Sequence, residues 1–156
     1  MVKFNSKERM KGAIHMEKVV TPIEIRYQET DQMGVVYHAN YLVWFEIGRT
    51  KYIEKLGLNY AEMEKHNIVS PVIDAQISYK KAMRYGEKAF VETWLHSYNG
   101  LRTVYGYHIK NANDEITVSG STEHVIVKKD TFRPLSLRKA FPDWHHIYSG
   151  QLIGDD

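Results

Sequence analysis

The chain has 156 residues and a mass of 18.2 kDa, a length at which one hydrophobic core and one domain are expected. Hydrophobic residues make up 43% and charged residues 26% of the chain, which excludes a disordered or fibrous protein. The net charge of +2 is too small to indicate nucleic acid as a partner, and a chain with no cysteine has no disulfide, thiolate metal site or cysteine nucleophile.

The N-terminal part of the sequence is predicted to change from an arm to a strand. Residues 1–18 are mostly charged or small and follow no sustained period, so we predict a flexible arm. No apolar run reaches the length of a membrane span or resembles a secretory leader, and we therefore expect a cytoplasmic protein. Apolar and polar residues alternate over 19–28, which predicts a strand, and turn-forming residues follow over 29–34.

The next segment carries the strongest helical pattern in the sequence. Apolar residues recur at three- and four-residue steps over 40–56, which predicts a helix of about 25 Å. Gly48 lies on the apolar stripe, where glycine is unfavourable for a helix, so we expect its backbone to approach the sheet closely. Asn59 followed by Glu62 resembles a capping box and predicts a second, short helix to about residue 65.

The remaining pattern is that of an antiparallel sheet. Strands are predicted over 69–79, 88–98, 101–110 and 115–128, with a type I′ hairpin at Asn99-Gly100. Apolar side chains fall on both sides of these strands, so both faces of the sheet need a cover. The long helix covers one face and a second copy of the chain the other, which predicts a homodimer or homotetramer. We assign the domain to 19–138 and a C-terminal tail, with one helical turn near 144–147, to 139–156.

The fold class predicted from these elements is α+β, with an antiparallel sheet of about five strands wrapped around one long helix. The chemistry is expected at the junction between the first strand and this helix, because other motifs are missing. There is no glycine-rich phosphate loop or serine-hydrolase elbow, and the eight histidines lack metal-site spacing. At the junction, Asp31 and His38 precede a helix start, where free backbone N–H groups attract negative charge. The alternative is structural: Asp31 and Gly34 form a turn, and Asn40 caps the helix.

A known family carries a similar junction. The residues concerned are Arg26-Tyr27, Asp31-x-x-Gly34-x-Val36-Tyr37-His38-x-Asn40-Tyr41 and Phe45-Glu46-x-x-Arg49. This pattern resembles the hotdog-fold acyl-CoA thioesterases of the 4-hydroxybenzoyl-CoA thioesterase superfamily, and among them the Tol-Pal-associated enzymes most. The resemblance implies a hotdog fold and hydrolysis of an acyl-CoA to a carboxylic acid and CoA, with no cofactor or metal.

The resemblance also implies roles for individual residues. Asp31 would be the catalytic carboxylate, acting either as nucleophile or as general base, of which we favour the base, with His38 and Tyr27 assisting. Backbone N–H groups near Tyr37 and His38 would hold the thioester oxygen. Tyr37 and Glu46 would contact the substrate, although Glu46 is equally well explained as a solvated helix charge.

A cationic loop and three alternatives complete the sequence prediction. Lys80, Lys81 and Arg84 would bind the phosphates of CoA, although a run of charge is more often only a solvated surface. One alternative is an acyl-ACP thioesterase, because acyl carrier protein presents the same thioester. Another is a non-catalytic acyl-carrier or lipid-binding module in which Asp31 is a turn residue. A nucleic-acid surface is disfavoured by the small net charge.

Overall fold

The computed structural model describes residues 18–152, so the predicted arm lies almost wholly outside the described residues. Five antiparallel strands form one sheet in the order β1-β4-β5-β6-β3. They are β1 (Val19–Glu24), β3 (Val72–Tyr79), β4 (Lys88–Tyr98), β5 (Arg102–Asn111) and β6 (Ile116–Val125). A small second sheet pairs β2 (Ile68–Val69) with β7 (Val127–Lys128). The predicted number of strands in the main sheet and the β4-β5-β6 meander are confirmed.

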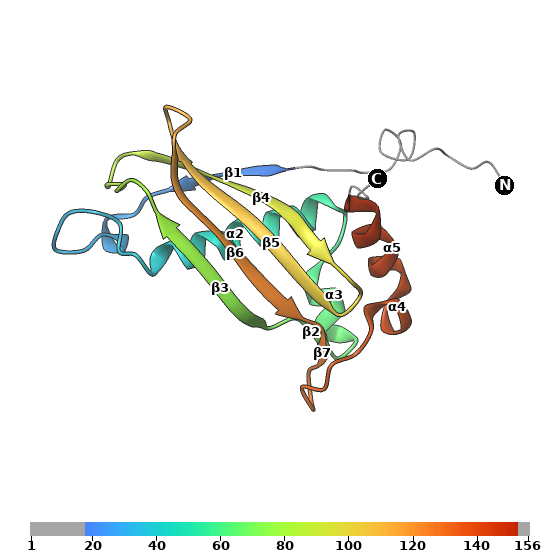
Figure 1. Ribbon diagram of the computed structural model, residues 1–156. Helices are drawn as coiled ribbons and strands as arrows, with labels where there is room; N and C mark the ends of the chain where they lie inside the picture. Colours follow the sequence, from blue (N-terminus) through green and yellow to red (C-terminus); the bar gives the residue numbers. More distant parts are fainter. Residues whose placement is uncertain (1–17, 153–156) are drawn as a thin grey trace, which may run out of the picture.

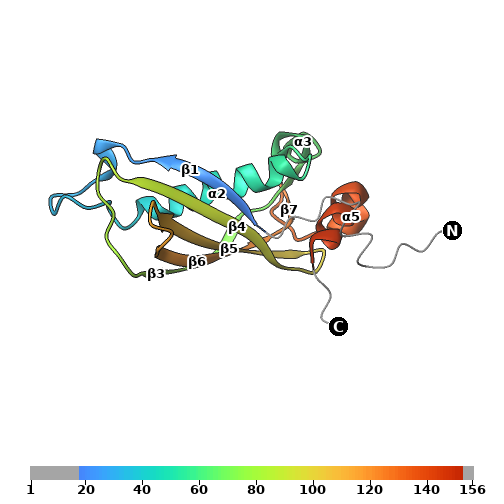
Figure 2. The ribbon, with the colours of Figure 1, turned by 90° about the horizontal axis from the view of Figure 1, so that it is seen from above.

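One long helix, α2 (Asn40–Lys55), lies along the concave face of this sheet (Figures 1 and 2). It contacts β1, β4 and β5, and the sheet curves around it as predicted. The other helices are α3 (Tyr60–Lys65), α4 (Leu137–Ala140), α5 (Pro142–Gln151) and the short 3-10 helix η1 (Tyr27–Glu29). Helices α4 and α5 lie at one end of the sheet, and the segment between β1 and α2 lies at the other (Figure 1). The long helix therefore connects the two ends of the molecule.

Aromatic side chains of α2 form the centre of the core. Trp44, Phe45 and Tyr52 are fully buried, as the helical period predicts. The ring of Phe45 stacks on that of Tyr107 in β5, with centroids 4.2 Å apart and planes 7° apart. Stacking at this distance fixes the height of the helix above the sheet.

The helix also approaches the sheet at Gly48. A Cβ atom built on Gly48 would lie 2.5 Å from Thr93 Oγ1 and 2.7 Å from Val91 Cγ1, both in β4. Real Cβ atoms do not approach other heavy atoms so closely, so any side chain there would push the helix from the sheet. The predicted close approach is confirmed.

Two predicted strands are interrupted in the structure. The predicted strand 69–79 is divided into β2 and β3 at Ser70-Pro71, where Pro71 has no N–H to donate to a ladder. The predicted strand 115–128 is divided at Ile126, whose N–H donates to the carbonyl of Leu101 at 2.9 Å instead of a strand partner. Both interruptions separate the small β2-β7 sheet from the main one.

The hairpin between β4 and β5 forms at the predicted place with a different turn. Only Gly100 has a positive φ, of 90°, so the predicted type I′ turn is wrong. The Asn99 side-chain oxygen instead accepts hydrogen bonds from the N–H groups of Leu101 and Arg102, at 3.0 and 2.7 Å. These two hydrogen bonds stabilise the turn, so Asn99 does not need the positive φ of a type I′ turn.

The C-terminal segment contains more helix than the single turn predicted at 144–147. Helix α5 begins with Pro142, whose missing N–H is tolerated at a first helical position, and buries Trp144 and Tyr148. The Tyr148 hydroxyl lies 2.9 Å from that of Tyr105, and both are buried. Helix α5 therefore packs into the core at the end of the sheet.

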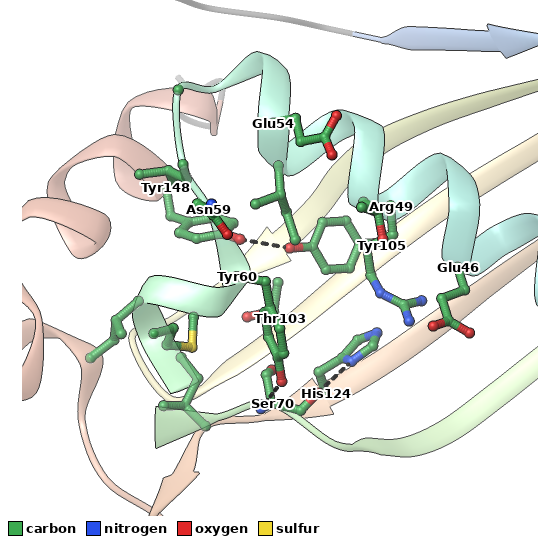
Figure 3. A pocket seen from close by; sticks show the side chains of 17 residues that line it. Glu46, Arg49, Glu54, Asn59, Tyr60, Ser70, Thr103, Tyr105, His124 and Tyr148 are labelled. Atoms are coloured by element: carbon green, nitrogen blue, oxygen red, sulfur yellow. Dashed lines mark hydrogen bonds between the residues drawn. The ribbon is translucent and has the colours of Figure 1, made fainter. Parts of the chain in front are cut away.

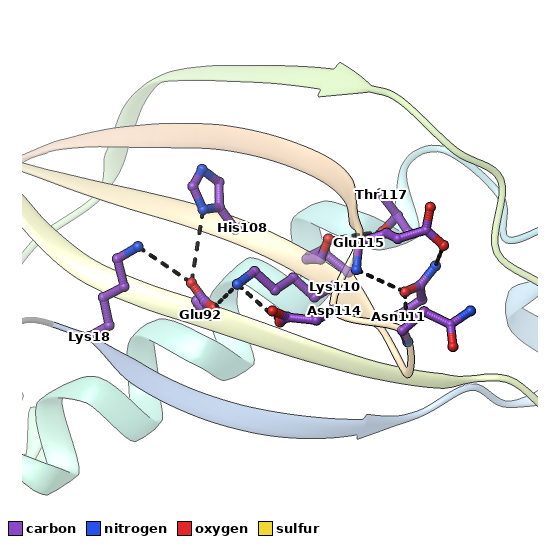
Figure 4. Close-up of polar contacts among 10 residues, drawn as sticks. Lys18, Glu92, His108, Lys110, Asn111, Asp114, Glu115 and Thr117 are labelled. Atoms are coloured by element: carbon purple, nitrogen blue, oxygen red, sulfur yellow. Dashed lines mark hydrogen bonds and ion pairs between the residues drawn. The ribbon is translucent and has the colours of Figure 1, made fainter.

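The convex face of the sheet carries a polar cluster around a buried carboxylate (Figure 4). Glu92 in β4 is 8% exposed, and it pairs with Lys110 Nζ at 2.6 Å and Lys18 Nζ at 3.5 Å. Burial raises the pKa of Glu92, but the neighbouring ammonium groups outweigh burial and hold it below the usual range. Lysines of the same chain thus offset this charge, although the Glu92 Oε2 atom has no hydrogen-bond partner within residues 18–152. No helix of residues 18–152 is long and apolar enough to cross a membrane.

Candidate active site

The segment between β1 and α2 is organised by Glu29, which the sequence analysis did not single out. Its carboxylate is 6% exposed and accepts hydrogen bonds from the Arg26 N–H at 2.9 Å and Trp44 Nε1 at 2.8 Å. Its carbonyl accepts from the Tyr37 N–H at 2.8 Å and Asn40 Nδ2 at 2.7 Å. Glu29 therefore ties both ends of the loop to the start of α2. The only signal in the sequence is the three-residue spacing of Arg26 and Glu29, which is that of a capping pair.

These contacts also determine the charge state of Glu29. Burial raises the pKa of its carboxyl, but the hydrogen bonds from Trp44 and Arg26 outweigh burial. The pKa lies below the usual range, so the side chain is ionised at neutral pH. Strand β1 ends at Glu24, earlier than the predicted end at residue 28. The Arg26 N–H donates to the Glu29 carboxylate and therefore cannot pair with a neighbouring strand.

Asp31 lies at the start of a tight turn within this loop. Its N–H donates to the Val35 carbonyl at 2.9 Å, and its carbonyl accepts from the Gly34 N–H at 3.0 Å. Gly34 has a φ of 79°, which this turn requires. One carboxylate oxygen of Asp31 accepts from the Met33 N–H at 2.8 Å, and no group of residues 18–152 donates to the other. Asp31 is therefore a turn residue, and it still presents a carboxylate oxygen to a substrate or a water molecule.

The first turn of α2 leaves backbone donors free. The residue before the helix is Ala39, which offers no side-chain cap, and Asn40 donates to Glu29 instead of capping the helix as the structural alternative supposed. Within the described range, no acceptor binds the N–H groups of His38, Ala39 or Tyr41. The N–H of Tyr37 donates to the Glu29 carbonyl, so among the donors predicted near Tyr37 and His38 this one is not free. The free donors begin one residue later, at the positive end of the helix dipole.

The side chains of the three aromatic residues predicted in the site lie on its surface. Tyr27 is 77% exposed and contacts the ring of Tyr85 edge-on, with centroids 5.8 Å apart. The rings of Tyr37 and His38 lie side by side at 4.4 Å, and both are exposed. The Tyr79 hydroxyl donates to the His38 carbonyl at 3.0 Å. These contacts place the end of β3 against the junction.

The predicted cationic loop lies beside the same junction. The Val36 N–H donates to the Met83 carbonyl at 2.8 Å, which links the segment 31–38 to the loop after β3. Lys80 and Arg84 are exposed, and no ion pair within residues 18–152 involves either. Lys81 differs because it forms an ion pair with Glu115. Two of the three predicted phosphate ligands are thus available to a substrate.

Glu46 is the one predicted residue that the structure places elsewhere. Its exposed side chain lies on α2 and lines a cavity between this helix, α3 and the sheet, away from Asp31 and the cationic loop. The described residues contain no cluster of three or more histidine or acidic side chains able to hold a metal ion. The junction therefore combines a carboxylate, free amides and two cations, a set suited to reactions at an anionic substrate's carbonyl.

Comparisons with known proteins identify the family of the chain. Residues 25–145 match the thioesterase-like superfamily. The Bacillus subtilis protein YneP, described as a candidate acyl-CoA thioesterase, is 57% identical over 126 residues, covering 81% of this chain and 91% of YneP. The Escherichia coli acyl-CoA thioester hydrolase YbgC is 24% identical over 119 residues, covering 76% and 89% of the two chains.

Solved structures of thioesterases have a similar fold. The crystal structure of a DHNA-CoA thioesterase from Staphylococcus aureus has a TM-score of 0.84 and 52% identity, covering 86% of this chain and 90% of that one. This similarity confirms the predicted hotdog fold, and with YneP it confirms the predicted enzyme class. The chain therefore belongs to the thioesterase-like superfamily and is a hotdog-fold thioester hydrolase.

Proposed function

We propose that this protein is an acyl-CoA thioesterase, which hydrolyses the thioester of an acyl-CoA to a free carboxylic acid and CoA. The observation that carries the proposal is the placement of Asp31, the free amides at the start of α2 and the cationic loop at one end of the molecule. The similarity to YneP and to the Staphylococcus aureus enzyme supports CoA as the carrier. The likeness to Tol-Pal-associated members stays a prediction that rests on the junction residues.

In the proposed mechanism, Asp31 acts as a general base. Its free carboxylate oxygen takes a proton from a water molecule, whose oxygen attacks the thioester carbonyl carbon. The N–H groups of His38 and Ala39 stabilise the negative charge that develops on the carbonyl oxygen. When the C–S bond breaks, Asp31 returns the proton to the sulfur of CoA. The chemistry needs no group beyond the chain and water.

The exposed aromatic side chains have supporting roles in this proposal. Tyr27 and His38 border the site, and their side chains are free to contact the thioester or the pantetheine arm. The oxyanion donor at position 38 belongs to the backbone, so removal of the imidazole leaves that donor in place. Loss of either side chain should therefore reduce the rate less than loss of Asp31 does.

The phosphates of CoA are assigned to Lys80 and Arg84. Both side chains are exposed in the loop after β3, which the hydrogen bond from Val36 to Met83 links to the junction, and each would gain a charge-assisted hydrogen bond from a phosphate. Lys81 is assigned to Glu115 instead. The prosthetic arm of acyl carrier protein would offer one phosphate, whereas CoA offers three. A site with two free cations therefore favours CoA as the carrier.

We also propose that the enzyme works as a homodimer or higher oligomer. Exposed apolar side chains gather on α2 and on the edge strand β3; they are Leu42, Val43, Ile47, Val72 and Ile73. An edge strand with apolar side chains is a pairing surface unless another chain covers it. Light scattering at micromolar concentration should give a mass of at least twice 18.2 kDa, and a monomer would contradict the proposal.

A substrate panel tests the proposed function. The purified protein is incubated with acyl-CoAs that differ in chain length and aromaticity, including DHNA-CoA, and released thiol is measured. The same acyl groups on acyl carrier protein form a matched second arm. We expect thiol release from at least one acyl-CoA at a higher kcat/KM than from its carrier-protein counterpart. Binding without thiol release in both arms would instead identify a non-catalytic acyl-binding module.

A further inference from the structure

A cavity of about 720 Å³ lies between the second half of α2, helix α3 and the inner face of β5 and β6 (Figure 3). Helices α4 and α5 close one side of it through Leu137 and Tyr148. None of the proposed catalytic residues lines this cavity. Its volume falls in the range of about 300–1,000 Å³ that is typical of sites for small molecules. The cavity is therefore a second candidate site, separate from the junction.

Apolar surface makes up just over half of the cavity wall. Leu58, Met63 and Ile126 contribute aliphatic side chains, and Tyr60 and Tyr105 contribute aromatic rings. The hydroxyls of these tyrosines already have partners in the protein, since Tyr60 accepts from the Ser70 N–H at 2.9 Å and Tyr105 contacts Tyr148. A ligand body in this part of the cavity would meet carbon atoms and satisfied polar groups, so it should be apolar.

The other end of the cavity carries a guanidinium group. Arg49 on α2 is half-buried and donates one hydrogen bond, from Nη1 to the Tyr107 hydroxyl at 3.1 Å. The polar chain continues from Tyr107 to Thr122 Oγ1 at 2.7 Å and from there to His124 Nε2 at 2.9 Å. This chain holds Arg49 in place with neutral groups. Most of its five N–H donors remain unused.

The electrostatics of the lining leave this charge without a bound counterion. Within residues 18–152, no carboxylate lies within 4 Å of the Arg49 guanidinium. Glu46 and Glu54, the two acidic side chains of the lining, are exposed at the cavity's edge and accessible to water. Burial and the nearby Arg49 lower the pKa of His124 to about 4, so His124 is neutral at pH 7. Arg49 is therefore the one cation of the lining.

We propose that this cavity binds a free monocarboxylic acid with an apolar body, whose carboxylate pairs with Arg49. A guanidinium fork matches the two oxygens of a carboxylate, and a half-buried charge gains from such a partner. The apolar wall would receive the rest of the molecule. The proposal adds a binding site to the hydrolytic activity. The cavity offers groups that bind a ligand, and Asp31 does not line it. The acid belongs to the same chemical class as the product of hydrolysis, so the site would let product influence the enzyme.

The test uses calorimetric binding of two acids and their neutral amides to the full chain at pH 7. Decanoate is compared with decanamide, and 2-naphthoate with 2-naphthamide, so that charge changes while the body stays the same. We expect at least one acid to bind about tenfold more tightly than its amide, as an ionic hydrogen bond predicts. In Arg49→Met, which keeps an unbranched side chain but removes the guanidinium group, acid and amide should bind equally. Arg49→Lys keeps the charge and should retain part of the preference.

The control variant is Arg102→Met, because Arg102 is an exposed arginine that pairs with Glu123 outside the cavity. It should leave the preference for the acid intact. Melting curves of each variant check that the fold survives. Absence of acid binding to the parent, equal binding of acid and amide, or a preference that persists in a folded Arg49→Met protein would overturn the proposal. Acid binding is measured without turnover, so this result is independent of thioester hydrolysis.

Discussion

Substitution of Gly48 by alanine sets two physical effects against each other. Alanine in place of glycine stabilises an isolated helix by about 1 kcal/mol. The new Cβ would however lie 2.5 Å from Thr93 Oγ1 and 2.7 Å from Val91 Cγ1. Both neighbours are buried, and β-branched side chains have little freedom to rotate away. Overpacking of a core costs about 1–3 kcal/mol, and with two such contacts we take its upper range.

The net effect is a loss of about 1–2 kcal/mol in the free energy of unfolding. For a chain of this length, that loss lowers Tm by about 2–8 °C. Thermal unfolding followed by circular dichroism measures it, at equal protein concentration because association would also shift Tm. The matched control is Gly150→Ala in α5, where a Cβ meets no atom within 4 Å. It should leave Tm unchanged or raise it. A rise in Tm for Gly48→Ala as well would refute the close-packing argument.

Two further predictions concern the junction and the cationic loop. Glu29→Gln removes the ionised acceptor of Trp44 and should cost about 1.5–3 kcal/mol at pH 7. Because the fold lowers the pKa of Glu29, its charged form stabilises the protein above the usual glutamate pKa, and this stabilisation is lost as the pH falls through the lowered value. The difference in Tm between parent and variant should therefore shrink below about pH 4, and an equal difference at pH 7 and pH 3 would contradict the assignment. The double variant Lys80→Ala/Arg84→Ala should raise KM for acyl-CoA more than Lys81→Ala does. The difference in KM between the parent and the double variant should become smaller with added salt. An equal rise in KM for the two proteins would argue against the phosphate assignment.

The sequence predicts those parts of the fold that depend on local pattern. The period of apolar residues identifies α2, and the glycine on its stripe indicates the close contact with β4. The breaks in the strands depend on distant contacts, such as that of Ile126 with Leu101, and the pattern of residues 115–128 contains no sign of it. The full length of helix α5 is not evident from the sequence pattern, because the helix packs against Tyr105, which lies 43 residues before Tyr148.

The candidate site likewise contains some residues that the sequence predicts and others that only the folded chain reveals. Asp31 and the helix start are visible as a turn followed by a helical period. Glu29 and Arg49 act through tertiary hydrogen bonds to Trp44 and Tyr107, which a linear pattern does not indicate. The availability of each lysine is likewise decided in space, since only the folded chain brings Glu115 to Lys81.

The most direct test of the account is kcat of Asp31→Asn on the best acyl-CoA of the panel. Asparagine keeps an oxygen for the Met33 N–H and hence the turn, but it does not accept a proton at neutral pH. Asp143→Asn, an exposed position on α5, is the matched control and should keep the parental kcat. We predict that Asp31→Asn keeps the parental Tm and KM while kcat falls by about 10²–10⁴. A folded Asp31→Asn protein with the parental kcat would contradict the account and leave Asp31 as a turn residue alone.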